Sequence, residues 1–403
     1  MAIAEQLARA RSDSGFDQED LASALGVSRA MVSYWEAGSR TPNDRQLVAL
    51  SRLLRTPIAV LLGHEEPSPT PDVAAMLMRG ADQELAAGDA HRGLREFAEF
   101  LDAYAELAEA TGFTIRGMHE SPFVSGAGYQ SGDDVRRKAE EVRAHLRVGL
   151  GPIGDIDAVC ELLGITVYRA RLGDDLSHTI SGAFFNHPVI GFSVLVNLDM
   201  TPGRRRFTVA HELAHALFHS KDSRYTVSTA RKPPRERFAD AFAGEFLMPT
   251  GGLRRVMEEQ GFSPRIDDPS EVIHLQRYFD VSYVTALVRL RQAKYLTQAS
   301  FEEFQRVRPV LLARSLGFEI GEEEYRPRPA VWRLERFPPR FRRLLRHAVR
   351  QGVISVPSAS AMTGLSIDEV AELVAAAVIG DAPLGEELTE IKQYADSGVF
   401  EVA

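Results

Sequence analysis

The chain has 403 residues, of which 44% are hydrophobic and 26% charged, and its formal net charge is −9. This balance is typical of an ordinary globular protein and excludes a uniformly basic surface, so any contact with nucleic acid must come from a local patch. Its one cysteine, Cys160, excludes an intramolecular disulfide, no apolar run reaches the ~20 residues of a membrane span, and no signal peptide opens the chain. We therefore expect a cytoplasmic protein with no membrane contact.

Residues 1–63 have the pattern of a small all-α domain. A short helix is predicted over residues 18–25, followed by a turn at Gly26 and a second short helix over residues 29–36, with Ser28 as its N-cap. Two short helices joined by a glycine-containing turn predict a helix-turn-helix, whose second helix enters the major groove of DNA.

This stretch closely resembles the Xre and lambda-repressor family of DNA-binding domains. The matching runs are Gln18-Glu-Asp-Leu-Ala, Leu25-Gly-Val-Ser, Ser33-Tyr-Trp-Glu-Ala-Gly and Arg40-Thr-Pro. The resemblance implies a set of contacts to double-stranded operator DNA: Gln18 and Asn43 near the backbone, and Ser28, Arg29, Ala30 and Ser33 at the bases. Residues 1–63 hold seven basic and seven acidic side chains, so we expect few phosphate contacts and binding as a homodimer. A helical interaction module that does not bind DNA is the alternative.

A linker and a charged helical segment are predicted over residues 64–132. Residues 64–72 contain three prolines and few apolar groups, which indicates an extended linker. Apolar positions between Val73 and Thr111 recur at helical spacing, which predicts a charged helical hairpin between two modules or a dimer interface.

A small sheet is expected in the next part of the chain. After two helices, strands are predicted over residues 165–169, 181–185 and 189–196, where β-branched and aromatic residues gather. His178 and Tyr225 are candidate donors to an oxyanion, although neither lies in a motif and each is also a reasonable surface residue.

The most informative run is His-Glu-x-x-His, which begins at His211. His211 and His215 are one helical turn apart, so both would lie on one face of a helix, where two imidazoles can hold one metal ion. Zinc suits this pair and can keep one position open for water, whose proton Glu212 would accept. Mn²⁺ and Fe²⁺ also bind imidazole and carboxylate ligands, so both ions remain alternatives to zinc. A core helix with solvent-facing histidines is the alternative to a metal site.

A second predicted helix offers the third ligand. Glu236 and Asp240 are again four residues apart, in a helical pattern that Pro249 ends. One carboxylate can bind the metal, while the other accepts the free N–H of a ligand histidine and fixes its tautomer. His219 comes too early to be the third histidine of the long zincin pattern, so the arrangement is that of a gluzincin.

The two runs Arg204–His215 and Glu236–Pro249 resemble the ImmA/IrrE family of metallopeptidases, over about residues 135–290. The resemblance implies these roles: His211, His215 and Glu236 as metal ligands, Glu212 as the catalytic carboxylate, and Asp240 as the partner of a ligand imidazole. Asn is usual in the family at the position of Asp240, a mild departure that leaves the ligand set intact. The family also implies a minimal zincin fold and a protein substrate, typically a repressor.

The C-terminal part, residues 291–403, is predicted to be helical. Residues 326–350 carry nine arginines and one acid, with aromatic residues among them, a composition that can bind nucleic acid or an acidic partner. Arginine stems that cover a helical face explain it equally well. Residues 352–373 resemble a second helix-turn-helix and could also form a dimerisation unit.

These patterns predict a mainly α protein with a small β-sheet (α+β), in four parts: 1–63, 64–132, 133–290 and 291–403. The leading hypothesis is a DNA-binding transcriptional regulator with a zinc endopeptidase domain that cleaves a regulatory protein or itself. The alternative is a regulator or antitoxin whose metal-binding domain senses a ligand, or acts as a scaffold, without proteolysis.

Overall fold

The computed structural model describes residues 3–13, 16–54, 61, 89–123, 131–173, 180–220, 225–228, 234–324 and 334–375. The chain divides into two compact units, Met1–Asp72 and Val73–Ala403. Helices dominate and one small sheet is present, which confirms the predicted α+β class. The predicted linker over residues 64–72 and the candidate donor His178 lie outside the described residues. Among the residues that are described, no helix has the length and apolar character that crossing a bilayer requires.

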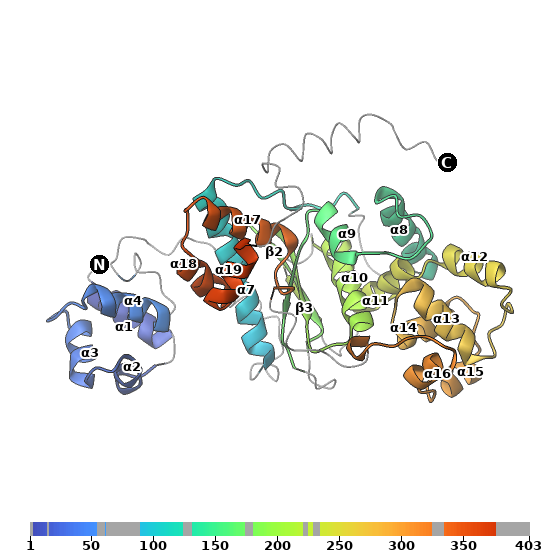
Figure 1. Ribbon diagram of the computed structural model, residues 1–403, viewed down its shortest axis with the longest axis horizontal. Coiled ribbons are helices and arrows are strands. Elements are labelled where there is room, and N and C mark those ends of the chain that lie inside the picture. The colour runs from blue at the N-terminus through green and yellow to red at the C-terminus, as the bar shows by residue number, and fades with distance from the viewer. Residues whose placement is uncertain are drawn as a thin grey trace. The chain divides into compact units, whose positions relative to one another are not determined.

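The first unit is a helical domain built from α1 (Ile3–Asp13), α2 (Gln18–Leu25), α3 (Arg29–Glu36) and α4 (Asp44–Leu54) (Figure 1). Gly26, at a φ of 65°, turns the chain between α2 and α3, a backbone conformation that glycine adopts without strain. The Ser28 side chain then accepts a hydrogen bond from the N–H of Met31 and caps α3, as predicted. The core side chains come from all four helices: Leu7, Leu21, Val32, Trp35 and Leu50.

The second unit is organised around a four-stranded sheet in the order β1-β3-β2-β4. The strands are β1 (Thr166–Ala170), β2 (Gly182–His187), β3 (Gly191–Asn197) and β4 (Tyr225–Ser228). β1 runs parallel to β3, and the other two pairs are antiparallel. Three of these strands agree with the prediction. The short edge strand β4 was missed, because four residues without an apolar run give no recognisable alternation.

Helices cover this sheet on both faces, and every residue of β3 is buried. Because successive side chains of a strand point to opposite faces, the strands contribute to two separate cores. Phe184 and Val194 belong to the core with the helices that carry the candidate site. Tyr168, Phe185 and Leu195 belong to the core on the other face.

Helices α8 to α16 belong to the side of the unit that carries the candidate site. They are α8 (Gly132–His145), α9 (Ile156–Leu162), α10 (Pro202–Phe218), α11 (Pro234–Leu247), α12 (Thr250–Gln260), α13 (Pro269–Phe279), α14 (Tyr283–Gln292), α15 (Gln298–Phe304) and α16 (Pro309–Ser315), before a 3-10 turn at Glu322–Glu324. The helix α10 packs against β2 and β3, and α11 packs against α10 and α8. The two helices that carry the predicted ligands are therefore held side by side, with α10 on the sheet.

The other face of the sheet is covered by α7 (Asp89–Thr111) together with α17 (Pro339–Arg350), α18 (Val356–Thr363) and α19 (Ile367–Ala375) (Figure 1). The ring of Phe100, on α7, stacks on Tyr168 of β1 at 4.4 Å and meets Phe341 of α17 edge-on at 5.1 Å. The apolar stripe of α7 is thus buried beneath the chain's own C-terminal helices. This differs from the predicted dimer interface, because periodicity shows that a face is buried but not what covers it. The first part of the predicted hairpin, residues 73–88, lies outside the described residues.

Within the described residues, the arginines of the segment 326–350 mostly bind the protein itself. Arg336 donates to Glu96 at 2.6 Å and to the Tyr168 hydroxyl at 2.7 Å, Arg340 donates to the Glu161 carbonyl at 2.8 Å, and Arg346 donates to the Leu373 carbonyl at 2.9 Å. These contacts favour the alternative in which the arginines cover a helical face and hold this layer of the protein together. In the same layer, α19 begins with Asp368 and Glu369, which makes it a poor reader of DNA.

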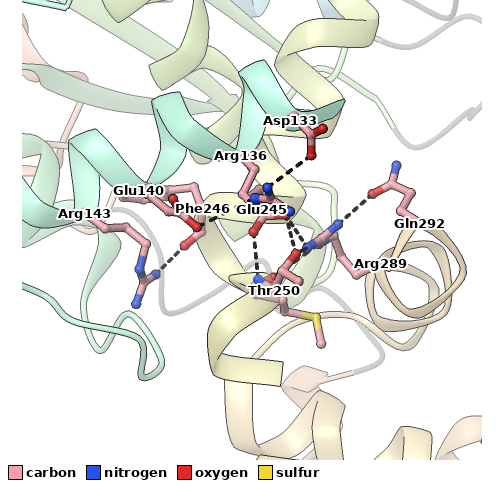
Figure 2. A network of polar contacts seen from close by, with 10 residues as sticks. Asp133, Arg136, Glu140, Arg143, Glu245, Phe246, Thr250, Arg289 and Gln292 are labelled. Atoms are coloured by element: carbon pink, nitrogen blue, oxygen red, sulfur yellow. Dashed lines mark hydrogen bonds and ion pairs between the residues drawn. The ribbon is translucent and has the colours of Figure 1, made fainter. Parts of the chain in front are cut away.

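Two buried arginines hold the C-terminal end of α11 (Figure 2). Arg143, on α8, donates to the carbonyl of Phe246, and Arg289, on α14, donates to the carbonyl of Met248 at 3.0 Å. Arg289 also pairs with Glu245, and both side chains are about 95% buried. Its stem lies against Gly244, where any Cβ would come within 2.5 Å of Arg289 Cδ. Positive charge at a helix C-terminus is favourable, so this network anchors α11.

Candidate metal centre and helix-turn-helix surface

The first two predicted ligands lie on α10, which Pro202 begins and whose apolar face packs on the sheet. His211 and His215 face the same way, because they are four residues apart on a continuous helix. Glu236 approaches them from the first turn of α11. Within the described part of the chain these three side chains form a group whose ligand atoms all lie within 4.8 Å of one another, and all three are buried. The structure therefore brings together the predicted ligand set.

Four ligand atoms from these three side chains lie close together. His211 Nε2 lies 3.0 Å from Glu236 Oε2, His215 Nε2 lies 3.2 Å from Glu236 Oε1, and the two Nε2 atoms are 3.2 Å apart. A tetrahedral site with bonds of about 2.0–2.1 Å would have edges of about 3.3 Å. Two imidazole nitrogens and one carboxylate at this spacing match the donor set of a catalytic zinc, so the residues fit the ion.

Asp240 contacts the other ring nitrogen of His211. The distance between His211 Nδ1 and Asp240 Oδ1 is 3.0 Å, which places the ring N–H on Nδ1 and leaves Nε2 facing the other ligands. Burial lowers the pKa of His211, but the hydrogen bonds to Asp240 and Glu236 outweigh it and raise the pKa to about 10. Burial raises the pKa of Glu236, while the bonds to the two histidines lower it well below its usual value. Without a metal, a proton holds this group together, and a metal would have to displace it.

His215 has a partner that was not predicted. Its Nδ1 lies 3.0 Å from Nδ1 of His219, which is the C-cap residue of α10 and is also buried. Burial and the neighbouring His215 lower the pKa of His219 to about 3, so this imidazole is neutral. The signal was present in the sequence, because His219 follows His215 by one helical turn, as His215 follows His211. From the sequence, His219 was considered only as a third metal ligand, and was rejected because it comes too early.

Glu212 is fully buried and faces the sheet. A Cβ placed on Gly182 of β2 would come within 2.8 Å of Glu212 Oε1 and 2.7 Å of the Thr208 methyl group. Only glycine therefore lets β2 approach α10 closely enough to hold this carboxylate beside His211. Sequence reasoning missed Gly182, since a single glycine in a strand has many explanations. Tyr225, a candidate donor, is the first residue of β4.

In the first unit, the residues predicted to contact bases lie on the solvent side of α3 and at its cap. Ser28, Arg29, Ala30 and Ser33 are all exposed, as is Asn43 ahead of α4. Gln18 is instead half-buried and donates to Glu36 Oε2 at 2.8 Å, beside the ion pair between Arg11 and Glu36. Its amide nitrogen therefore ties α2 to α3, which leaves its carboxamide oxygen as the atom for the predicted backbone contact.

Comparison with known proteins agrees with both halves of this description. Residues 7–61 match the model of the helix-turn-helix family, and residues 160–291 match the model of the IrrE N-terminal-like domain. The HTH-type transcriptional regulator DicA of Escherichia coli (strain K12) is 38% identical over 74 residues, which are 18% of this chain and 55% of that protein. The chain thus spans about half the length of the curated relative it matches. Both predicted resemblances are confirmed, and the chain joins a helix-turn-helix domain to an IrrE N-terminal-like domain.

Proposed function

We propose, from this pairing of a helix-turn-helix domain with an IrrE N-terminal-like domain, that the protein is a cytoplasmic DNA-binding transcriptional regulator with a zinc endopeptidase centre. The observation that carries the proposal is the close group of His211, His215 and Glu236 ligand atoms, with the Glu212 carboxylate buried on the same helix as the two histidines. A purely structural helix has no need for four buried ionisable groups at one point, since burying each of them costs free energy. A metal centre explains all four.

In the proposed chemistry, a zinc ion held by His211, His215 and Glu236 would acidify a water molecule and polarise the peptide carbonyl. Glu212 accepts the proton from that water and later delivers it to the leaving amine, a general base and then a general acid. Asp240 holds the His211 ring in the tautomer whose Nε2 is free to act as a ligand. The edge strand β4 lies next to β2, on the side of the sheet where an extended peptide could add a strand.

The proposal is tested first by metal content, measured by mass spectrometry on the purified wild type, His215→Ala and Glu236→Ala. We expect close to one zinc per wild-type chain and almost none in either variant, because each loses one of three protein ligands. Glu258→Ala, which changes an exposed glutamate on α12, is the matched control and should keep its zinc. A folded wild type that holds no metal after incubation with zinc would contradict the proposal, and bound manganese or iron would correct the ion.

The regulator half of the proposal rests on the exposed surface of α3. We propose that it contacts operator DNA as a homodimer, because one unit with balanced charge offers few phosphate contacts. The protein substrate would be a repressor or this chain itself, and its cleavage would change transcription. Because the DNA-binding domain and the endopeptidase centre belong to one chain, binding to the operator brings the centre close to other proteins bound there and raises their effective concentration.

Arg29→Ala is expected to weaken binding to duplex DNA from upstream of the protein's own gene by about 1–3 kcal/mol, or five- to 150-fold. The Arg29 side chain is 67% exposed and its nearest acid, Glu19, is 4.0 Å away, so it is available to DNA. Fluorescence anisotropy at several salt concentrations measures the effect, with Arg254→Ala on α12 as the control. Equal affinity of Arg29→Ala and wild type, or no binding by wild type at low salt, would count against this surface.

A further inference from the structure

His219 lies on the far side of the His215 ring from the other ligand atoms. His215 directs Nε2 to Glu236 and His211, and its Nδ1 is the atom that lies 3.0 Å from His219 Nδ1. The two nitrogens of an imidazole point away from each other, so His219 cannot reach the other ligand atoms while it keeps this contact. His219 is therefore not a fourth ligand.

We propose that His219 is a positioning residue that fixes the tautomer of His215 and thereby strengthens metal binding. This inference rests on the proposed metal centre. A neutral imidazole that gives Nε2 to a metal carries its hydrogen on Nδ1, and that N–H is usually held by an outer partner. Both rings are buried, so an N–H without an acceptor would be destabilising. His219 Nδ1 accepts this bond, which places the hydrogen of His219 on its own Nε2.

The surroundings hold His219 in the geometry that this role needs. The backbone N–H of His219 donates to the His215 carbonyl at 3.0 Å, so the same two residues are joined through main chain and side chain. The ring meets Phe238 of α11 edge-on at 5.3 Å. The ammonium group of Lys138 lies over the rings of Phe218 and Phe238, which closes this side of α10. His219 is thus held between α10 and α11, and Lys138 of α8 covers the neighbouring rings.

The two histidine ligands have different partners for a reason of charge. His211 is backed by the Asp240 carboxylate, while His215 is backed by a second imidazole, which cannot carry a negative charge at neutral pH. Glu236, Asp240 and Glu212 already bring three carboxylates to a place where a divalent ion supplies two positive charges. A fourth carboxylate behind His215 would add uncompensated negative charge in a buried site. A neutral imidazole orients the ligand without that cost.

Zinc affinity of the full-length protein, measured by competition with a chromophoric chelator, tests the role. His219→Leu fills the space with an apolar side chain and removes the acceptor, so we expect zinc affinity to fall about 10- to 100-fold. His219→Asn places an amide oxygen near the position of Nδ1 and should stay within about threefold of wild type, because the acceptor is kept. His145→Asn, at an exposed histidine of α8, is the matched control.

Long-range ¹H–¹⁵N spectra of the zinc-loaded wild type report which ring nitrogen of each histidine carries the hydrogen. This measurement does not depend on whether the variants fold. We expect the ring hydrogen of His215 on Nδ1 and that of His219 on Nε2. Coordination of His215 through Nδ1, or a folded His219→Leu protein that binds zinc as tightly as wild type, would overturn the role of His219 and leave the metal centre standing. A wild type that binds no zinc would overturn both.

Discussion

Glu212→Gln is expected to lower peptide-bond cleavage by about two to four orders of magnitude while zinc stays bound. The amide of glutamine cannot accept the proton of the attacking water at neutral pH, whereas the side chain keeps its shape. Shape matters here, because the carboxylate is packed between α10 and Gly182 of β2 with no room for a larger group. His211, His215 and Glu236 are unchanged, so the metal content should equal that of wild type.

The experiment compares zinc-loaded wild type, Glu212→Gln and Glu258→Gln, whose exposed glutamate lies far along the chain on α12. Cleavage is followed on a mixed library of internally quenched peptides and, by mass spectrometry, on the protein's own chain. Cleavage by Glu212→Gln at the wild-type rate would refute the role of Glu212 as base. A zinc-loaded wild type that cuts neither substrate would favour the alternative of a metal-binding sensor without proteolysis.

The largest loss of stability is expected from Arg289→Met, at about 3–5 kcal/mol. The Arg289 guanidinium donates to Glu245, to the Met248 carbonyl and to the Thr250 hydroxyl. Methionine fills the space but leaves the Glu245 carboxylate buried without its cation. Loss of this anchor frees the C-terminal end of α11, the helix that carries Glu236, so zinc affinity should fall together with stability.

Urea unfolding of the full chain, followed by circular dichroism, measures this effect, with the exposed Arg254→Met as the control. The double variant Glu245→Gln/Arg289→Met separates charge from packing. Its glutamine oxygen can still accept from the Thr250 N–H, which Glu245 does at 2.7 Å, but no charge stays buried. We expect the double variant to recover at least about 1–2 kcal/mol relative to Arg289→Met. No recovery would mean that the loss comes from packing and from the bonds to the Met248 carbonyl and the Thr250 hydroxyl, rather than from a buried charge.

The ligand geometry was predictable from sequence because it depends on helical periodicity, a local property. The spacing of four residues places His211 and His215 on one face of α10, and the same spacing joins Glu236 to Asp240 on α11. That the two helices meet was inferred from the need for a third ligand and from the family resemblance, since no local pattern encodes their contact. The structure agrees: His211 bridges Glu236 and Asp240 through its two nitrogens.

The parts that escaped prediction depend on contacts between residues far apart in the chain. The apolar stripe of α7 was recognised as a helix face, but its partners are the strand β1, about 70 residues later, and helices more than 200 residues later. The role of Gly182 depends on the close packing of β2 against α10, which the sequence does not show. The edge strand β4 is defined by pairing with β2 rather than by its own composition. The charged pair Arg289 and Glu245 likewise has no signature in the sequence.

The layer formed by α7 and α17–α19 has a consequence for synthesis of the protein. Glu96 and Arg336, which are joined across this layer, are 240 residues apart. At about 5–20 residues per second, a ribosome needs about 12–50 s to make the chain between them. During that time the part of α7 that packs on α17, where Phe100 and Tyr104 meet Phe341, has no permanent cover. The nascent chain therefore offers a binding site for chaperones, which closes only when the last helices leave the ribosome.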